Sequence, residues 1–540
     1  MLKPNYKKLL EPSLLLIFFL SWFSILMPWN KLPDPDAFYH ATIAKLTYEQ
    51  GAITSFPWLD LTTLGRHFAD QHFLFHVLQI PFVNIFGLTQ GSRLSSITLA
   101  LICMMVIYII FRLLKLKPAW LWAVLLSLLY PFSVRLILGK ASPLAILLWM
   151  ISLALTSLIL INKKNISKSS SYIFYFLFFI FALFFSLSHG GWIILPLSTL
   201  ILFMGHVLYE KALFPGPFKL VLYKLPWAGL LAGLLGLATG ILLHPGRREL
   251  LSFLWVQVIK IGVMTPSQAI PMGQEWASAN LGELLAASSV FLLIIILTVP
   301  GLIFAARKIN FFETDDELQK FARLSVVWGI LVAVLGALTL KSLRFSEYFQ
   351  PALVIWVASL FQLIDWKKLL SWLSLDGGAK GRFLIPVIIL IASGSLLARS
   401  VWNGYHVMHS KPMFMDNQYQ PALQAISQQA QPGDRIFHAQ WDEFPILLAH
   451  DQRFKYVAGM DPTFFYEADR ALALDYFALT INRASTTQEQ VWSVAHDRLQ
   501  AKYALIDTER WPELAQIFAQ DKRYIEIGRG PDAVAYRIED

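Results

Sequence analysis

The sequence of 540 residues contains a single cysteine, Cys103, and few charged residues. Cys103 lies inside an apolar run, so one chain can form neither an internal disulfide nor a cysteine-based metal site. Only 15% of the residues are charged, whereas 56% are hydrophobic, with 40 Phe and 18 Trp. A chain so poor in charge is too apolar for a soluble protein. The composition therefore predicts a polytopic membrane protein.

Hydrophobic runs long enough to cross the hydrocarbon core of a bilayer recur through most of the chain. These runs fall at about 12–28, 93–112, 119–134, 141–161, 171–187, 191–209, 226–243, 286–305, 324–340, 349–364 and 383–398. They predict roughly eleven transmembrane helices. No small-residue cleavage pattern follows the first run, so we expect it to be retained as the first span.

Lysine and arginine gather in alternate connections between these runs, and such residues are retained on the cytoplasmic side of a membrane. With an odd number of spans, the pattern predicts a cytoplasmic N-terminus and an extracytoplasmic segment after residue 399. The net charge of +9 is then largely a topology signal. Because the basic residues form no clustered face in the sequence, we expect no nucleic-acid partner.

Two of the predicted outer loops are long. Residues 29–92 contain two stretches, 38–50 and 71–86, whose apolar residues recur at the spacing typical of helices that lie along a membrane surface. Residues 244–285 are punctuated by proline and glycine and contain no predicted span. Loops of this length are commonly functional or disordered, so both are candidates for a site.

From about residue 410 the composition changes to that of a soluble segment. Residues 433–438 read as a loop that enters a strand, and residues 503–507 read as another strand. A segment of roughly 130 residues can bury a modest core of its own. The predicted fold class is therefore a polytopic α-helical membrane protein, residues 1–409, with a small C-terminal soluble α/β domain, residues 410–540.

A pair of carboxylates, Asp34 and Asp36, comes directly after the first hydrophobic run. Charge beside a bilayer is costly unless water, a cation or a ligand compensates it, so the pair predicts a polar site that faces one aqueous side. The alternative is a solvated loop in which an aspartate caps the following helix.

Several short motifs follow one another along the chain. They are Asp34-Pro35-Asp36-Ala37-Phe38-Tyr39-His40, Thr63-Leu64-Gly65-Arg66, Ser188-His189-Gly190-Gly191-Trp192, Leu343-Arg344-Phe345 and Trp441-Asp442-Glu443-Phe444. In this order they resemble the catalytic subunit of oligosaccharyltransferases, which are membrane glycosyltransferases of the GT-C class. The resemblance implies the transfer of a sugar or oligosaccharide from a polyprenyl-(di)phosphate donor to an acceptor outside the cytoplasm.

The resemblance also implies roles for single residues. In the family the first-loop aspartate binds a divalent cation and orients the acceptor. Asp34 matches it, Asp36 is a second carboxylate nearby, and Mg²⁺ or Mn²⁺ is the expected ion. Arg344 matches the family's phosphate-binding arginine, unless Arg344 is an interfacial anchor. Arg66 resembles that arginine more weakly. Glu275 resembles the carboxylate that contacts the acceptor, unless it is a surface residue.

Two departures from the family pattern concern the metal and the acceptor. The turn that carries a second acidic motif in the relatives runs here from Arg135 to Ser142 without a carboxylate. Either Lys140 stands in place of the metal and neutralises phosphate directly, or Asp70 or His72 folds back to complete a metal site.

The motif of Trp441 and Asp442 resembles the WWDYG signature that recognises the hydroxyl residue of a glycosylation sequon, but one tryptophan and the tyrosine are missing. The acceptor is therefore open between a protein, a lipid and a glycan.

Histidines supply further candidates. His40 lies in the first motif and is a candidate catalytic residue. His189 precedes two glycines that either permit close approach of a ligand or serve helix packing. His72 and His76 are four residues apart, so they either bind zinc together or anchor an interfacial helix through its polar face.

The alternative functions are a transporter and a scaffold for lipid-linked glycans or polysaccharides. A transporter needs polar residues near the middle of the membrane and access from both sides. The motifs here gather on one predicted face, which favours the enzyme. The compact single chain favours the plasma (inner) membrane of a prokaryote as its location.

Overall fold

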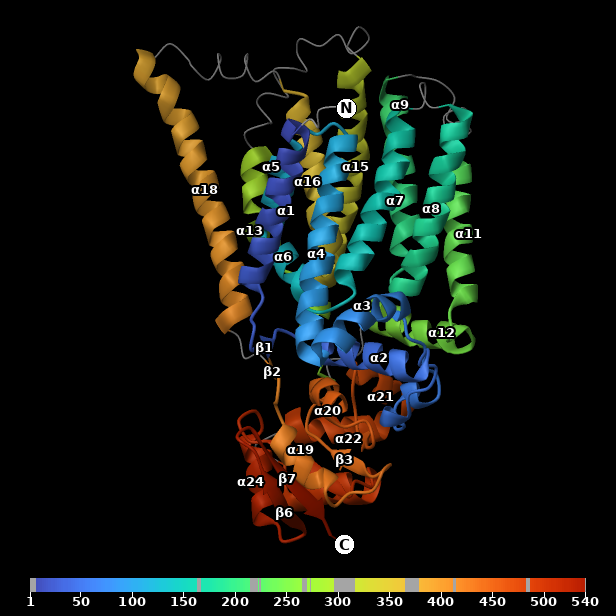
Figure 1. Ribbon diagram of the computed structural model, residues 1–540, viewed down its shortest axis with the longest axis vertical. Coiled ribbons are helices and arrows are strands. Elements are labelled where there is room, and N and C mark those ends of the chain that lie inside the picture. The colour runs from blue at the N-terminus through green and yellow to red at the C-terminus, as the bar shows by residue number, and fades with distance from the viewer. Residues whose placement is uncertain are drawn as a thin grey trace.

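The computed structural model describes residues 6–162, 167–213, 222, 225–264, 270–271, 273–295, 316–364, 378–410, 414–481 and 486–539. They form a bundle of long helices with a smaller region of strands and short helices at one end (Figure 1). The start of α1 lies at the end of the bundle opposite to this C-terminal region (Figure 1).

Apolar runs form the long helices, because a helix satisfies its backbone hydrogen bonds internally where no water is present. The long helices are α1 (Tyr6–Leu26), α4 (Leu88–Leu113), α7 (Ser142–Asn162), α8 (Lys168–Ser188), α9 (Ile194–Leu213), α11 (Trp227–Leu243), α15 (Asp316–Lys341), α16 (Ser346–Gln362) and α18 (Gly378–Ser410). Among the described residues, five helices are long and apolar enough to cross a membrane, or up to seven if each of two bent pairs is one span. The predicted span 286–305 lies partly outside the described residues, which there include the short helix α13 (Leu281–Ala287).

The predicted span 119–134 is wrong as a single helix. It divides into α5 (Ala119–Ser127) and α6 (Tyr130–Ile137), which are bent by 74°. Leu129 is extended and Pro131 lies in the first turn of α6, where its missing N–H and its ring prevent continuation of the preceding helix. The bend directs α6 and the turn after it towards the C-terminal region.

The 244–285 loop also contains structure that the sequence did not predict. The chain bends by 116° after α11 and forms α12 (Arg247–Leu254), followed by a helical segment, η3 (Trp255–Met264). The helices predicted at 38–50 and 71–86 are confirmed as α2 (Asp36–Gln50) and α3 (Phe73–Phe86). Together α2, α3 and α12 lie across the end of the bundle, between the long helices and the C-terminal region (Figure 1).

The C-terminal region contains a five-stranded sheet in the order β4-β3-β5-β7-β6. β3 is parallel to β4 and β5, whereas β7 is antiparallel to both β5 and β6. The strands predicted at 433–438 and 503–507 are confirmed as β3 and β5. The elements of this region are β3 (Arg435–Phe437), β4 (Lys455–Tyr456), β5 (Tyr503–Asp507), β6 (Tyr524–Arg529), β7 (Ala533–Ile538), α19 (Gln420–Ser427), α20 (Phe444–His450), α21 (Pro462–Ala468), α22 (Arg470–Ile481), α23 (Gln488–Trp492) and α24 (Pro512–Gln520).

The first loop and the C-terminal region are packed together. Strand β1 (Lys31–Leu32) pairs antiparallel with β2 (Phe414–Met415). The rings of Phe56 and Phe444 lie 5.8 Å apart within an apolar core that both parts share. Asp60 of the first loop also binds Lys455, with Nζ and Oδ2 2.7 Å apart. These contacts fix the C-terminal region against the end of the bundle.

Candidate active site

A cavity of about 460 Å³ lies where the start of α2, the turn after α6 and the C-terminal region meet. Most residues singled out in the sequence line it, although they come from distant parts of the chain. They are Asp34, Asp36, His40, His72, Arg135, Lys140, His189, Glu275, Arg344, Trp441 and Asp442. Arg66 is instead exposed and does not line the cavity, so the structure does not bring it together with the other candidate phosphate-binding residues.

Lys140 binds both carboxylates of the first motif. Its Nζ lies 3.0 Å from Oδ2 of Asp34 and 2.8 Å from Oδ2 of Asp36. The turn can present Lys140 here because Gly139 adopts a positive φ of 78° and a Cβ at that position would lie 2.6 Å from Cβ of Ala37. A side chain at position 139 would therefore push the turn away from α2.

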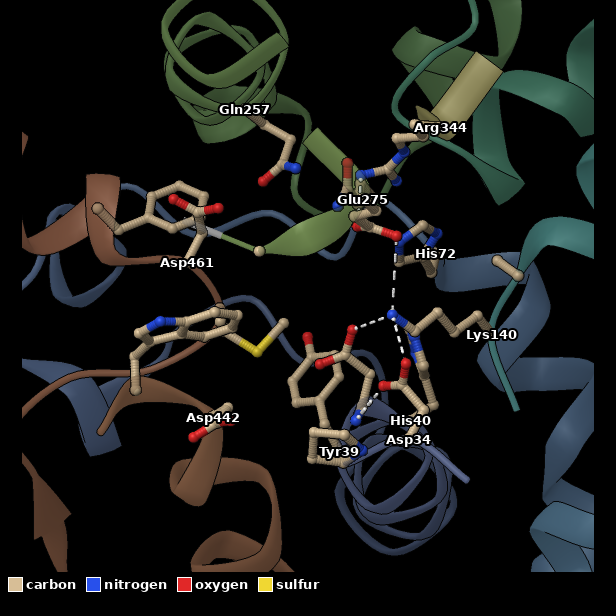
Figure 2. Close-up of a pocket in the computed structure, with 18 of the residues that line it drawn as sticks. Asp34, Tyr39, His40, His72, Lys140, Gln257, Glu275, Arg344, Asp442 and Asp461 are labelled. Carbon is tan, nitrogen blue, oxygen red and sulfur yellow. Dashed lines mark hydrogen bonds and ion pairs between the residues drawn. The ribbon is translucent and has the colours of Figure 1, made fainter. Parts of the chain in front are cut away.

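Glu275 is held among three cations. Its Oε2 accepts a hydrogen bond of 2.9 Å from Arg135 and lies 3.9 Å from Nζ of Lys140. Its Oε1 accepts a hydrogen bond of 3.1 Å from Arg344, whose guanidinium also lies 4.7 Å from the ring centroid of Trp276. Figure 2 shows Lys140 between Asp34 and Glu275, with Arg344 beyond them. Arg135 and Arg344 are thus oriented by one carboxylate.

Burial sets the charge states at this cluster. Burial and the neighbouring Asp36 raise the pKa of Asp34 to about 6, although Lys140 opposes the rise. Burial lowers the pKa of Lys140, but the carboxylates outweigh it and the pKa lies above its usual range. Burial also disfavours charge on Glu275, yet the cations led by Lys140 hold its pKa well below the usual range. At neutral pH the cluster is therefore charged.

His40 and His72 lie on the same side of the cavity as Lys140 (Figure 2). His76 is buried and forms hydrogen bonds with both His40 and Asp70. It is therefore neither a polar anchor at the membrane surface nor paired with His72 as a zinc ligand. Nδ1 of His72 donates to the carbonyl oxygen of Ser188. Nδ1 of His189 accepts from the N–H of Gly191, which leaves its Nε2 to carry the proton.

The predicted metal ligands Asp34, Asp36, Asp70 and His72 do not form one cluster. Among the described residues, no three His, Cys, Asp or Glu side chains are arranged to hold a metal ion. Asp34 and Asp36 already share the ammonium of Lys140, whereas Asp70 accepts from Nδ1 of His76 and from the N–H of His72. This donor set does not fit a divalent cation, because the hard oxygen ligands are divided between two separate partners.

The C-terminal region forms the opposite wall of the cavity. Nε1 of Trp441 donates to the carbonyl oxygen of Pro271, and Asp442 binds Arg510 at 2.9 Å. Asp461 and Gln257 lie across the cavity from Lys140 (Figure 2). Asp461 caps α21 by accepting from the N–H of Thr463, and burial raises its pKa to about 6.

We expect Asp461→Asn to stabilise the protein at alkaline pH. Burial raises the pKa of Asp461 from 3.8 to about 6, which corresponds to ~3 kcal/mol. The proton is bound more tightly in the folded state, so its stabilising effect is complete below pH 4 and is lost as the pH rises through 6. Asparagine keeps the helix cap without the buried charge. Thermal unfolding at pH 4 and pH 8 should give an advantage for the variant only at pH 8.

Asp469→Asn is the matched control for Asp461→Asn, because Asp469 is exposed and also accepts a backbone hydrogen bond at the start of a helix. Its stability should stay within about 0.5 kcal/mol of the parent at both pH values. An advantage of Asp461→Asn that is equal at both pH values would contradict the buried charge as its cause.

One cavity residue, Asp461, and one residue behind the cavity, Glu347, carry signals in the sequence that indicate other roles. Glu347 binds Arg135 and is fully buried in the first turn of α16. An acidic residue at the start of an apolar run is also typical of a helix N-terminus, so this pattern does not single out Glu347. Asp461 precedes Pro462 and reads as an ordinary helix cap. The position of Glu347 shortly after the Arg344 motif is the signal that could have identified Glu347 as a site residue.

No protein-family model matches the sequence, and no curated protein matches it either. Solved structures do match over nearly the whole chain. The archaeal oligosaccharyltransferase AglB from Archaeoglobus fulgidus, in complex with an inhibitory peptide and a dolichol-phosphate, matches with a TM-score of 0.62 and 13% identity, covering 99% of this chain and 75% of that chain. ArnT from Cupriavidus metallidurans, bound to undecaprenyl phosphate, matches with a TM-score of 0.58 and 13% identity, covering 99% of this chain and 98% of that chain.

A further structure of the Archaeoglobus fulgidus oligosaccharyltransferase, in complex with Zn and sulfate, matches with a TM-score of 0.54 and 13% identity, covering 97% of this chain and 73% of that chain. At such low identity the likeness shows the fold alone. AglB and ArnT are GT-C glycosyltransferases, so the resemblance predicted from the sequence is confirmed at the level of the fold. The apolar helices and this fold together identify an integral membrane protein.

Proposed function

We propose that this protein is a glycosyltransferase that moves a sugar or oligosaccharide from a polyprenyl-(di)phosphate donor to an acceptor at the extracytoplasmic membrane face. The observation that carries the proposal is the meeting of Lys140, Arg135 and Arg344 around Glu275 in one cavity at the end of the helix bundle. The AglB and ArnT structures with dolichol-phosphate and undecaprenyl phosphate support a lipid-phosphate donor.

Arg344 and Lys140 would hold the donor phosphate. The leaving group gains negative charge as the sugar departs, and cations fixed in a partly dry cavity lower the barrier by stabilising that charge. Two protons of the Lys140 ammonium are directed to Asp34 and Asp36, which leaves the third for a phosphate oxygen on the Glu275 side. Arg344 would form two parallel hydrogen bonds to phosphate.

Lys140 would therefore supply the local positive charge that a divalent cation supplies elsewhere, and no step here uses a metal. Asp34 and Asp36 would orient the acceptor next to His40, and Trp441 and Asp442 would bind it from the opposite wall. A protein segment, a lipid headgroup and a glycan all remain candidate acceptors.

We expect cells that carry Asp34→Ala to accumulate a polyprenyl-linked glycan that cells with the parent chain consume. Removing Asp34 leaves Lys140 with one strong partner and the acceptor without one of its carboxylates. Mass spectrometry of membrane lipids measures the result, and the mass of the accumulated lipid separates a diphosphate-linked oligosaccharide from a monophosphate-linked sugar.

Asp497→Ala is the control for Asp34→Ala, because Asp497 is an exposed carboxylate of the C-terminal region away from the cavity. Its lipid pool should match that of the parent chain. If Asp34→Ala also leaves the pool unchanged, the proposed transfer is wrong and a transporter or scaffold for lipid-linked glycans becomes the better description.

A further inference from the structure

Asp70, His76 and His40 form a continuous row of hydrogen bonds that ends at the cavity. Nδ1 of His76 lies 2.7 Å from Oδ2 of Asp70, and Nε2 of His76 lies 2.7 Å from Nδ1 of His40. The three residues are 3%, 0% and 4% exposed. Of the three, only His40 lines the cavity. A buried carboxylate is thus connected to the cavity through two imidazole rings.

The chemistry of Asp70, at the buried end of the row, determines the direction of these hydrogen bonds. The Asp70 carboxylate only accepts, so Nδ1 of His76 carries a proton and Nε2 of a neutral His76 has a lone pair. That lone pair accepts from Nδ1 of His40, which leaves the lone pair of His40 on Nε2. The described part of the chain makes no other hydrogen bond to His40, so Nε2 is available to a molecule in the cavity.

The charge states of the two end groups, His40 and Asp70, depend mainly on burial and on His76. Burial, together with the neighbouring rings of His76 and His72, lowers the pKa of His40 well below its usual range, so His40 is neutral at neutral pH. Burial opposes ionisation of Asp70, but the bond with His76 outweighs it and holds the pKa of Asp70 below the usual value. The row therefore ends in a fixed negative charge, which stabilises a proton that arrives at the other end.

We propose that Asp70 and His76 are positioning residues that hold His40 as the general base for a hydroxyl acceptor. This inference rests on the proposed function and deepens it, because it names the acceptor chemistry. The same logic operates where a carboxylate fixes the tautomer of a catalytic histidine, here with one additional ring in between. It also gives Asp70 a role that does not involve a metal.

The proposed step transfers the sugar from the donor phosphate to the acceptor oxygen. The acceptor hydroxyl oxygen forms a bond to the anomeric carbon of the donor, and the bond from that carbon to the phosphate oxygen breaks with its electron pair remaining on phosphate. The hydroxyl proton passes to Nε2 of His40 as the new bond forms. The products are an O-glycoside and a polyprenyl phosphate or diphosphate, and the proton leaves His40 for water once the products depart.

A hydroxyl suits this base better than a carboxamide does. An attacking hydroxyl becomes strongly acidic as its oxygen bonds to carbon, and a neutral imidazole then takes the proton readily. The nitrogen of a carboxamide shares its lone pair with the carbonyl group, so a base that waits for its proton does not free that pair for attack.

The first test is Asp70→Asn, assayed in membranes with the polyprenyl-linked glycan extracted from Asp34→Ala cells as donor. The asparagine NH₂ group donates to Nδ1 of His76, which reverses both hydrogen bonds and places a proton on Nε2 of His40. We expect the rate at saturating donor to fall by about 10²–10⁴-fold. The KM for donor should change less than about threefold, because Lys140 and Arg344 are untouched.

Glu49→Gln is the matched control, since Glu49 is an exposed carboxylate of the same loop that pairs with Lys45 outside the cavity. It should keep the parent rate. If parent membranes consume no donor, the proposed function itself fails. If they consume it and Asp70→Asn does so within threefold of the parent rate, or loses activity through KM alone, only the inference about His40 is overturned.

A second pair of variants keeps the test decisive if Asp70→Asn folds poorly. In His76→Gln the side-chain carbonyl can accept from Nδ1 of His40, whereas in His76→Leu nothing can. We expect the glutamine variant to be at least about tenfold faster than the leucine variant, and equal rates would contradict the relay. The product of the parent enzyme should carry its glycan on oxygen by mass spectrometry, and attachment to an amide nitrogen would overturn the acceptor assignment.

Discussion

Lys140→Met is expected to lower the rate of sugar transfer by about 10²–10³-fold. The ammonium of Lys140 binds Asp34 and Asp36 and, in the proposed function, also contacts the phosphate of the donor. Its loss removes positive charge from the leaving group and leaves two carboxylates side by side, one of which takes up a proton at neutral pH because like charges at this distance oppose each other. Donor consumption by membranes measures the rate.

Divalent cations should partly restore Lys140→Met. Without the ammonium, Asp34 and Asp36 offer oxygen ligands of the kind that Mg²⁺ and Mn²⁺ prefer. We expect millimolar Mn²⁺ to raise the rate of the variant by about tenfold or more, with little effect on the parent enzyme. Lys115→Met is the control, because Lys115 is exposed at the end of α4 and distant from the cavity. A parent enzyme that loses its activity in a chelator would contradict the role of Lys140 as the local cation.

The sequence predicted the helical bundle because long apolar runs admit few other structures. It also predicted the helices α2 and α3, whose apolar spacing is regular. It did not predict the break between α5 and α6, since the run from 119 to 134 is long and mostly apolar, which hydrophobicity alone does not distinguish from a single span. That break matters for function, because it turns α6 towards the cavity and so places Arg135 beside Glu275.

Most of the cavity could be predicted from short motifs, but the partners within it could not. Lys140 stands out because it occupies a turn where the resemblance implies carboxylates. Glu347 lies 212 residues from Arg135, and no local pattern connects the two. His40 and His76 are 36 residues apart on two helices, and their contact depends on how α2 packs on α3. Periodicity describes one element at a time, whereas these contacts depend on the packing between elements.

Arg135→Leu is expected to destabilise the protein by about 3–5 kcal/mol. Glu347 is fully buried, and its Oε2 accepts hydrogen bonds of 3.1 Å and 2.8 Å from Nε and Nη2 of Arg135. Removing the guanidinium leaves a buried carboxylate without its partner, which costs far more than the pair itself contributes. Thermal unfolding in detergent micelles measures the loss. Arg529→Leu, which breaks an exposed pair with Glu526, should cost about 0–1 kcal/mol.

The double variant Arg135→Leu/Glu347→Leu separates stability from activity. Replacing both members of a buried ion pair with apolar side chains is often neutral, so we expect most of the lost stability to return. Transfer should not return, because Nη1 of Arg135 also binds Oε2 of Glu275 and thereby orients the carboxylate that faces Lys140 and Arg344. A double variant that regains both stability and parent activity would mean that Arg135 only neutralises Glu347. Stability without transfer would make Arg135 part of the phosphate-binding cluster, with Glu347 as the buried charge that holds it there.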